Sequence, residues 1–108
     1  MNYLECINGI LMKEVARHDR LVAFGQNIAA GSFLGGLTRD IKVKARGRVI
    51  NSTNSENTLV GFGFGLALAG ANAIFFMRQM DFLLLTADQL VNTYNIIRNK
   101  PEGVKGSF

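Results

Sequence analysis

The sequence predicts an α/β fold in which a parallel sheet lies between layers of helices. Short, wholly apolar runs at residues 21–24 and 73–77 have the length and composition of strands that are buried on both faces. Longer stretches with apolar residues at helical spacing alternate with these runs, at residues 2–17, 56–69 and 81–98. This alternation is typical of a three-layer structure, a parallel sheet flanked by helices.

The composition is that of one small globular domain with a single core. The chain has 108 residues, of which 48% are hydrophobic and 19% are charged, and its formal net charge is +4. Its one cysteine, Cys6, can form no internal disulfide and no cysteine-based metal site, which fits a reducing compartment. The first residues, MNYLEC, lack the basic start of a secretory signal. We therefore expect a cytoplasmic protein, or one of the mitochondrial matrix if the source is eukaryotic.

The first half of the chain is expected to contain a helix, a strand, a second helix and a second strand. Residues 2–17 carry apolar side chains at helical spacing, at Leu4, Ile7, Leu11 and Val15. The apolar run 21–24 is followed by a glycine, which predicts a strand and then a turn. Residues 29–36 are expected to form a loop that opens onto a helix near residues 37–43. Residues 48–50 are expected to form the next strand.

The second half is expected to alternate helix, strand and helix. A polar loop at residues 52–55 precedes a buried helix at residues 56–69, and a buried strand follows at residues 73–77. Residues 81–98 have the pattern of a long helix, with four apolar residues on one side: Leu84, Ala87, Leu90 and Val91. Residues 99–108 form a polar tail.

A glycine-rich run at residues 59–77 carries no charged residue and has the length of a membrane span. Its hydrophobicity is thinned by Gly61, Gly63, Gly65 and Gly70. Gly70 also suits the left-handed position that ends a helix, so the run divides into a helix, a turn and a strand. We therefore expect no membrane span, with a small membrane protein as the alternative. The glycine spacing also fails to match a dinucleotide-binding loop, which needs a third glycine where this chain has Leu66.

Four basic residues form a short cluster, Lys42, Lys44, Arg46 and Arg48. Such a cluster can bind phosphates, but it is also what a solvated edge of a domain looks like. No aromatic residue lies between the basic ones, as a surface that binds single-stranded nucleic acid would require. We favour the solvated edge and expect no nucleic-acid partner.

Glu56 is the candidate functional residue that the fold alone suggests. It follows the loop that leaves the strand at residues 48–50, and ligands in parallel sheets bind at the carboxyl ends of the strands. The residues after it, among them Leu59 and Val60, are apolar, and a carboxyl group in such surroundings can share its proton near neutrality. The alternative is purely structural, since an acid in the first turn of a helix also interacts favourably with the helix dipole.

Several stretches taken in order resemble the pyrimidine-binding domain of thiamine diphosphate enzymes. The resemblance is greatest to the beta subunit of the decarboxylating component of 2-oxo acid dehydrogenase complexes. It rests on GRVINSTNSENTLVGFGFGLALAG, on FFMRQMDFLLLTADQLVN, and upstream on VAFGQNIAAGSFLGGLT. The matching positions are Arg48, Glu56, Gly61, Gly65, Gly70, Phe82, Asp88 and Gln89. On this resemblance residues 1–108 are the N-terminal part of a transketolase-like pyrimidine-binding domain. Its C-terminal part is then missing, because GVKGSF is similar to the start of a further strand.

The resemblance implies a role for each of four side chains. Glu56 would hydrogen-bond the ring nitrogen of the cofactor aminopyrimidine and drive its amino group to the imino form, which takes the proton from the thiazolium carbon. Phe82 would stack on the aminopyrimidine, although an ordinary core phenylalanine is the alternative. Leu59 and Met80 would line the same pocket.

The resemblance also implies a cofactor, a partner and a substrate. The cofactor is thiamine diphosphate, and its diphosphate and Mg²⁺ would be held mainly by another chain, since the phosphate-binding motif is missing from this one. No metal site is expected here. The partner would be an alpha-type subunit in a hetero-oligomer, and the substrate a 2-oxo acid.

Two departures from the family pattern keep alternatives open. Gln26 and Asn27 stand where an acid is usual, and the loop 51–55 lacks the usual proline and aspartate. A transketolase-like or acyloin-forming carboligase subunit, or a non-catalytic assembly subunit of the same fold, therefore remains possible.

Overall fold

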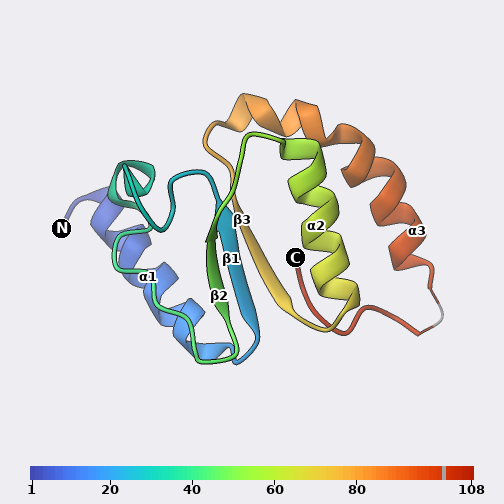
Figure 1. Cartoon of the computed structure of the whole chain (residues 1–108), viewed down its shortest axis with the longest axis horizontal. Helices are drawn as coiled ribbons and strands as arrows, with labels where there is room; N and C mark the ends of the chain where they lie inside the picture. The colour runs from blue at the N-terminus through green and yellow to red at the C-terminus, as the bar shows by residue number, and fades with distance from the viewer. Residues whose placement is uncertain (101) are drawn as a thin grey trace.

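The computed structural model describes residues 1–100 and 102–108 and contains a sheet of three parallel strands. The strands are β1 (Leu21–Gly25), β2 (Arg48–Asn51) and β3 (Asn72–Phe76), in the spatial order β2-β1-β3 (Figure 1). Both pairings with the central strand β1 are parallel. The predicted strands are confirmed to within one residue at each end, and so is the parallel α/β fold.

Helices cover the sheet on both faces. Helix α1 (Tyr3–Arg17) lies on one side, and α2 (Glu56–Leu68) and α3 (Tyr94–Arg98) lie on the other (Figure 1). Side chains alternate across the central strand, so Leu21 and Ala23 belong to a core on the α1 side that also contains Val15.

The opposite face of β1 carries Phe24, which is 1% exposed. Its ring stacks on that of Phe75 with centroids 5.3 Å apart and meets the edge of Phe62 of α2 at 5.0 Å. A second cluster on this side joins Val60 and Phe64 of α2 to Ile97 of α3. The sheet thus separates two cores, and β1 contributes to both faces.

The prediction of a helix near residues 37–43 is wrong. The chain forms instead a short 3₁₀ helix, η1 (Phe33–Gly36), followed by turns. Asp40 has a φ of 60°, which interrupts any helix, and the buried hydroxyl of Thr38 donates to the carbonyl of Ile28 at 2.9 Å. Tertiary contacts determine the conformation of this stretch, and the local pattern of apolar residues does not. Its apolar residues Leu37, Ile41 and Val43 pack against the core on the α1 side without forming a helix.

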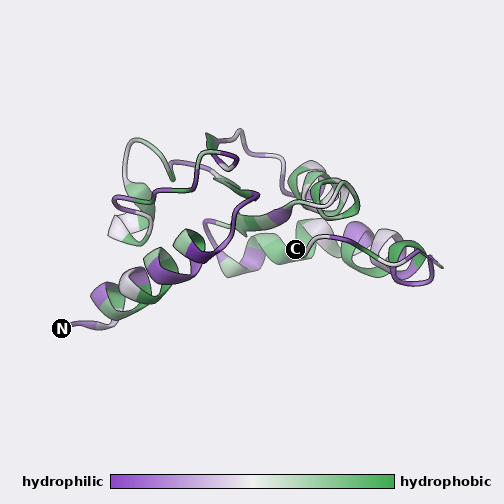
Figure 2. Ribbon diagram, turned by 90° about the horizontal axis from the view of Figure 1, so that it is seen from below, coloured by the Kyte–Doolittle hydropathy of each residue, from purple (hydrophilic) through white to green (hydrophobic). Residues whose placement is uncertain are grey.

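The expected long helix at residues 81–98 is present as a continuous helical segment of mixed geometry. It begins as a 3₁₀ helix, η2 (Met80–Thr86), widens into a π-helical turn, η3 (Gln89–Thr93), and ends as α3. We call residues 80–98 the helical segment. Apolar residues occur along both this segment and α2 (Figure 2), and several on the segment face solvent, including Leu84 at 81% and Ile96 at 67% exposure.

The uncharged glycine-rich run divides as the sequence predicts. Helix α2 ends in a Schellman motif, in which Gly70 has a φ of 87° and the N–H of Ala71 donates to the carbonyl of Leu66 at 2.9 Å. Strand β3 follows two residues after Gly70. Among the described residues, helices that are both long and apolar enough to cross a membrane do not occur.

The last residues begin to extend the sheet. Ser107 forms an isolated parallel bridge with Asn72, and its carbonyl accepts from the N–H of Ala73 at 2.8 Å. The side chain of Phe108 lies over Gly63 of α2 and meets the ring of Phe64 edge to face, with centroids 5.1 Å apart. The expectation that GVKGSF starts a further strand is therefore supported by this pairing, which lies beside β3.

Candidate functional site

The three strands end together at one edge of the sheet. In the register of the sheet, Gly25 lies between Asn51 of β2 and Phe76 of β3, the last residues of their strands. We call this the carboxyl edge. The N–H of Ser52 donates to the carbonyl of Gly25 at 2.9 Å, which continues the β1–β2 pairing into the loop that leads to α2. Parallel sheets bind ligands at this edge, so it is the place to look for a site.

Glu56 is the first residue of α2 and stands beside the carboxyl edge, as the sequence predicts (Figure 1). It is half-buried. The preceding residue, Ser55, occupies the N-cap position, but its side chain makes no capping bond to the helix backbone and donates instead to the hydroxyl of Thr58 at 2.9 Å. The carboxylate thus lies at the positive end of the helix dipole, where a negative charge is favoured.

The other three candidates lie in α2 and η2, which pack against each other. Phe82 in η2 and Leu59 in α2 are half-buried. Met80, the first residue of η2, is 86% exposed. Figure 1 shows η2 crossing above the start of α2, so Glu56 and Phe82 belong to neighbouring elements at the same edge.

Asp88 and Gln89, which match the family pattern, bond within the helical segment. Asp88 accepts from the side-chain amide of Asn92 at 2.7 Å, and Gln89 accepts from the hydroxyl of Thr93 at 2.6 Å. The amide of Gln89 also lies against Gly61 of α2, where an added Cβ would meet it at 3.4 Å. These residues therefore order the segment and its packing on α2.

Sequence reasoning missed Asn51. Its side-chain oxygen accepts two hydrogen bonds, from the backbone N–H of Ile28 at 2.9 Å and from that of Ala29 at 2.8 Å. These bonds hold the turn that follows β1 against the end of β2. An amide at the last position of a strand was the available signal, but its partners lie 22 and 23 positions earlier in the chain.

Ser52 carries a buried hydroxyl oxygen that has no hydrogen-bond partner among the described residues. It lies at the carboxyl edge, at the start of the loop to Glu56. A buried polar atom without a partner costs about 1–3 kcal/mol of stability. Such an atom beside a candidate site is compatible with a ligand or partner that supplies the missing bond.

We predict that Ser52→Ala leaves the free energy of unfolding unchanged or raises it by up to about 1 kcal/mol, because it removes an unsatisfied hydroxyl. Thr38→Val is the matched control, since the Thr38 hydroxyl has a partner in the carbonyl of Ile28. It should lower the free energy of unfolding by about 1 kcal/mol. Urea unfolding followed by circular dichroism measures both. A clear loss of stability in Ser52→Ala would mean that its hydroxyl is bonded in solution.

An apolar cavity on the α2 side is lined by none of the four candidate residues. It has a volume of about 450 Å³ and lies between α2, β3 and the helical segment. Its lining is almost entirely apolar and includes Val60, Ile74, Phe75, Leu83, Leu90 and Phe108. The residues that line it include neither Glu56 nor any other carboxylate.

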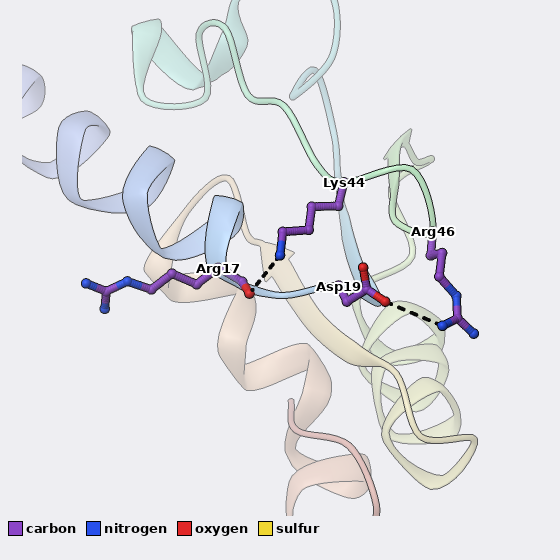
Figure 3. Close-up of polar contacts among 4 residues, drawn as sticks. All are labelled: Arg17, Asp19, Lys44 and Arg46. Atoms are coloured by element: carbon purple, nitrogen blue, oxygen red, sulfur yellow. Dashed lines mark hydrogen bonds and ion pairs between the residues drawn. The ribbon is translucent and has the colours of Figure 1, made fainter.

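The basic cluster leads into the start of β2, whereas the loop to Glu56 leaves the end of that strand. Figure 3 shows Lys44 and Arg46 of this cluster beside Arg17 and Asp19. Lys44 donates to the carbonyl of Arg17 at 3.4 Å, and Arg46 pairs with Asp19 at 3.4 Å. Arg48 donates to the carbonyl of Gly47 at 2.7 Å. All three side chains are exposed, and those of Lys44 and Arg46 join the loop before β2 to the end of α1 and the residues after it. Exposed contacts of this kind add little stability.

The part of the chain that the structure describes contains no group of three His, Cys, Asp or Glu residues placed to hold a metal ion. An acid and an aromatic ring at the carboxyl edge can bind a heteroaromatic ring, the acid by hydrogen bonding and the aromatic by stacking. Glu56 and Phe82 are side chains of these two kinds, in elements that pack against each other. Neither side chain can hold a diphosphate, which needs cationic or metal partners.

Comparison with known families identifies the fold. A family model described as "Transketolase, pyrimidine binding domain" matches residues 1–99. The chain belongs to this family. The edge that carries Glu56 is thus the carboxyl edge of a transketolase-type pyrimidine-binding domain.

Individual relatives of this pyrimidine-binding domain are beta subunits of dehydrogenases. The chain is 28% identical over 92 residues to the mitochondrial 2-oxoisovalerate dehydrogenase subunit beta of Chaetomium thermophilum, covering 85% of this chain and 20% of that protein. It is 30% identical over 92 residues to the mitochondrial 2-oxoisovalerate dehydrogenase subunit beta 2 of Arabidopsis thaliana, covering 85% and 26%. It is 29% identical over 96 residues to the pyruvate dehydrogenase E1 component subunit beta of Mesostigma viride, covering 86% and 29%. The chain therefore spans less than a third of the length of these relatives.

Proposed function

We propose that this chain is part of a beta-type subunit of a thiamine diphosphate-dependent 2-oxo acid dehydrogenase, the component that decarboxylates the 2-oxo acid. The observation that carries the proposal is the place of Glu56, at the start of α2 beside the carboxyl edge of a pyrimidine-binding domain. The names of the relatives support it, since those proteins are beta subunits of 2-oxoisovalerate and pyruvate dehydrogenases. Residues 1–108 would form the N-terminal part of the pyrimidine-binding domain.

Each candidate residue would have a defined task. Thiamine diphosphate, when bound, supplies carbanion chemistry at its thiazolium carbon. The carboxyl of Glu56 would hydrogen-bond the aminopyrimidine ring nitrogen and hold the proton there. Phe82 would stack on the flat ring and orient it, and Leu59 would add apolar surface that excludes water. Met80 is exposed in this chain, so it could line the pocket only where a partner covers it.

A partner chain would complete the site. The described residues offer no acidic cluster for Mg²⁺, so an alpha-type subunit would hold the diphosphate and the metal ion in a hetero-oligomer. The helical segment supports an interface on this side of the molecule. Its exposed apolar residues include Leu84, Leu85, Val91 and Ile96, at 58–81% exposure. Exposed apolar side chains that gather on one element are typical of interaction surfaces.

A second candidate is a non-catalytic assembly subunit of the same fold. It is favoured by the loop 51–55, which lacks the proline and aspartate that are usual in the family, and by the solvent exposure of Met80. A carboligase subunit would use the same Glu56 and differ only in the acceptor. Cofactor binding without turnover would identify the assembly subunit, and product analysis would distinguish decarboxylase from carboligase.

The proposal is tested by co-expressing the chain with an alpha-type subunit and titrating the purified assembly with thiamine diphosphate and Mg²⁺. Isothermal titration calorimetry should detect saturable binding, and a 2-oxo acid should then be decarboxylated. An assembly that binds no cofactor at millimolar concentration would contradict the proposal. The alpha-type subunit alone is the control for binding that needs no beta chain.

Within that assembly, Phe82→Leu is expected to weaken thiamine diphosphate binding by about 2- to 12-fold, because ring stacking contributes about 0.5–1.5 kcal/mol. Calorimetry measures the change in Kd. Tyr3→Leu is the matched control, since Tyr3 is an aromatic residue of α1 that is 83% exposed and lies on the other side of the sheet. Equal Kd values for Phe82→Leu and the unmodified chain would identify Phe82 as an ordinary packing residue.

A further inference from the structure

The turn after β1 is bonded at both of its ends to two consecutive residues of β2 and its loop. Before the turn, the carbonyl of Gly25 accepts from the N–H of Ser52 at 2.9 Å. After it, the N–H groups of Ile28 and Ala29 donate to the side-chain oxygen of Asn51 at 2.9 and 2.8 Å. The turn and the start of the loop to Glu56 are therefore joined by three hydrogen bonds.

The far end of the turn has little freedom for a second reason. Ile28 is fully buried, and its carbonyl accepts from the buried hydroxyl of Thr38 at 2.9 Å. The backbone of Ile28 is thus held from both sides, by Asn51 through its N–H and by Thr38 through its carbonyl. Between the two fixed ends lie Gln26 and Asn27, both half-buried, with Asn27 at a φ of 55°. Ligands of parallel sheets bind at the carboxyl edge, so polar residues in a turn at this edge are candidates to contact a ligand.

We propose that Asn51 is a positioning residue for the pyrimidine site, which fixes the turn carrying Gln26 and Asn27 relative to the loop that carries Glu56. The inference rests on the proposed function, because it concerns the site that Glu56 would form. Asn51 touches neither cofactor nor substrate in this role. It makes the two sides of the site one rigid unit, so that a ring held by Glu56 meets a preformed turn and not a mobile one.

The chemistry of the contact defines the variants. A side chain at position 51 must offer one oxygen to two N–H donors, so Asn51→Ala removes the contact. Asn51→Asp keeps it, because a carboxylate accepts from backbone N–H groups at least as well as an amide. Asn54→Ala is the matched control, since Asn54 is an exposed asparagine of the same loop.

The first measurement is amide hydrogen exchange by NMR on the unliganded, isotope-labelled chain. In Asn51→Ala the protection of the Ile28 and Ala29 amides should fall at least tenfold, while that of Ala73 in β3 stays the same. Asn51→Asp should keep the protection, because its carboxylate oxygen accepts from both N–H groups. Asn51→Asp retains the size of the native side chain, so it remains decisive if Asn51→Ala does not fold. Unchanged protection in Asn51→Ala, or a tenfold loss of protection in Asn51→Asp, would overturn the inference.

The second measurement is the Kd for thiamine diphosphate in the assembly with the alpha-type subunit. Asn51→Ala should weaken binding about tenfold, Asn51→Asp by less than about threefold, and Asn54→Ala not at all. Lost protection with an unchanged Kd would also overturn the inference, since the turn would then be irrelevant to the site. A failure of the proposed function looks different, because the unmodified assembly would then bind no thiamine diphosphate at all.

Discussion

Replacing Glu56 with glutamine should lower the turnover of the assembled enzyme by about 10²- to 10⁴-fold, the range that a positioned proton-transferring group contributes. Glutamine has the same shape as glutamate and can still form hydrogen bonds. Its amide, however, neither releases nor binds a proton near neutral pH. Helix α2 should still form, because the Ser55 side chain at its N-cap bonds Thr58 and not the Glu56 side chain. Steady-state kinetics with a 2-oxo acid measures the loss of turnover.

The specificity of this effect is checked with Asp81→Asn. Asp81 is an exposed acid in the first turn of η2, close in sequence to Phe82, and its neutralisation makes the same change in net charge. Turnover of Asp81→Asn should stay within about threefold of the unmodified assembly, as for a surface charge that is screened by salt. If Glu56→Gln turned over as fast as the unmodified chain, the role assigned to Glu56 would be wrong.

Gly25→Ala is expected to lower the free energy of unfolding by more than about 3 kcal/mol, which places it among the most damaging single substitutions. A Cβ at this position would overlap the backbone carbonyl oxygen of Phe76, which β3 cannot withdraw without losing its pairing with β1. The backbone conformation at Gly25, with a φ of 157°, also disfavours a side chain. Urea unfolding followed by circular dichroism gives the difference, or shows that the variant does not fold.

Gly65→Ala provides the matched control for the same chemical change. Gly65 lies within α2, and a Cβ there would meet nothing within 4 Å. Alanine favours the helix over glycine by about 0.5–1 kcal/mol, so this variant should be more stable than the unmodified chain. Unfolding of Gly25→Ala and Gly65→Ala at the same urea concentration would contradict the close approach of β1 and β3.

The strands could be predicted because each is a short apolar run that is bounded by turn residues, a property of neighbouring residues. The conformation of residues 37–43, expected to be a helix, could not be predicted, because contacts with residues distant in the sequence hold this stretch. Thr38 bonds the carbonyl of Ile28, and the chain bends at Asp40 with a positive φ. The π-helical turn at η3 could not be predicted either, because there the side chain of Gln89 packs against Gly61 of α2, a contact between distant residues.

For the candidate site, the structure bears on where the predicted residues lie, and the roles assigned to them stay predictions. The position of Glu56 follows from the rule that ligands meet parallel sheets where strands end, and the family pattern supplied Phe82 and Leu59. Asn51 was missed because its partners, Ile28 and Ala29, are far away in the sequence. The exposure of Met80 depends on what covers η2, which no local pattern encodes.

The packing of Phe108 bears on how the protein should be handled. Its ring lies against Gly63 and faces those of Phe24 and Phe64, with centroid distances of 6.4 and 5.1 Å. An affinity tag fused directly after Phe108 would disturb the packing of these aromatic rings and the β-bridge between Ser107 and β3. Met1, by contrast, is 96% exposed and projects away from the sheet (Figure 1). Dyes and surface-immobilisation handles should therefore disturb the packing less beside Met1 than beside Phe108.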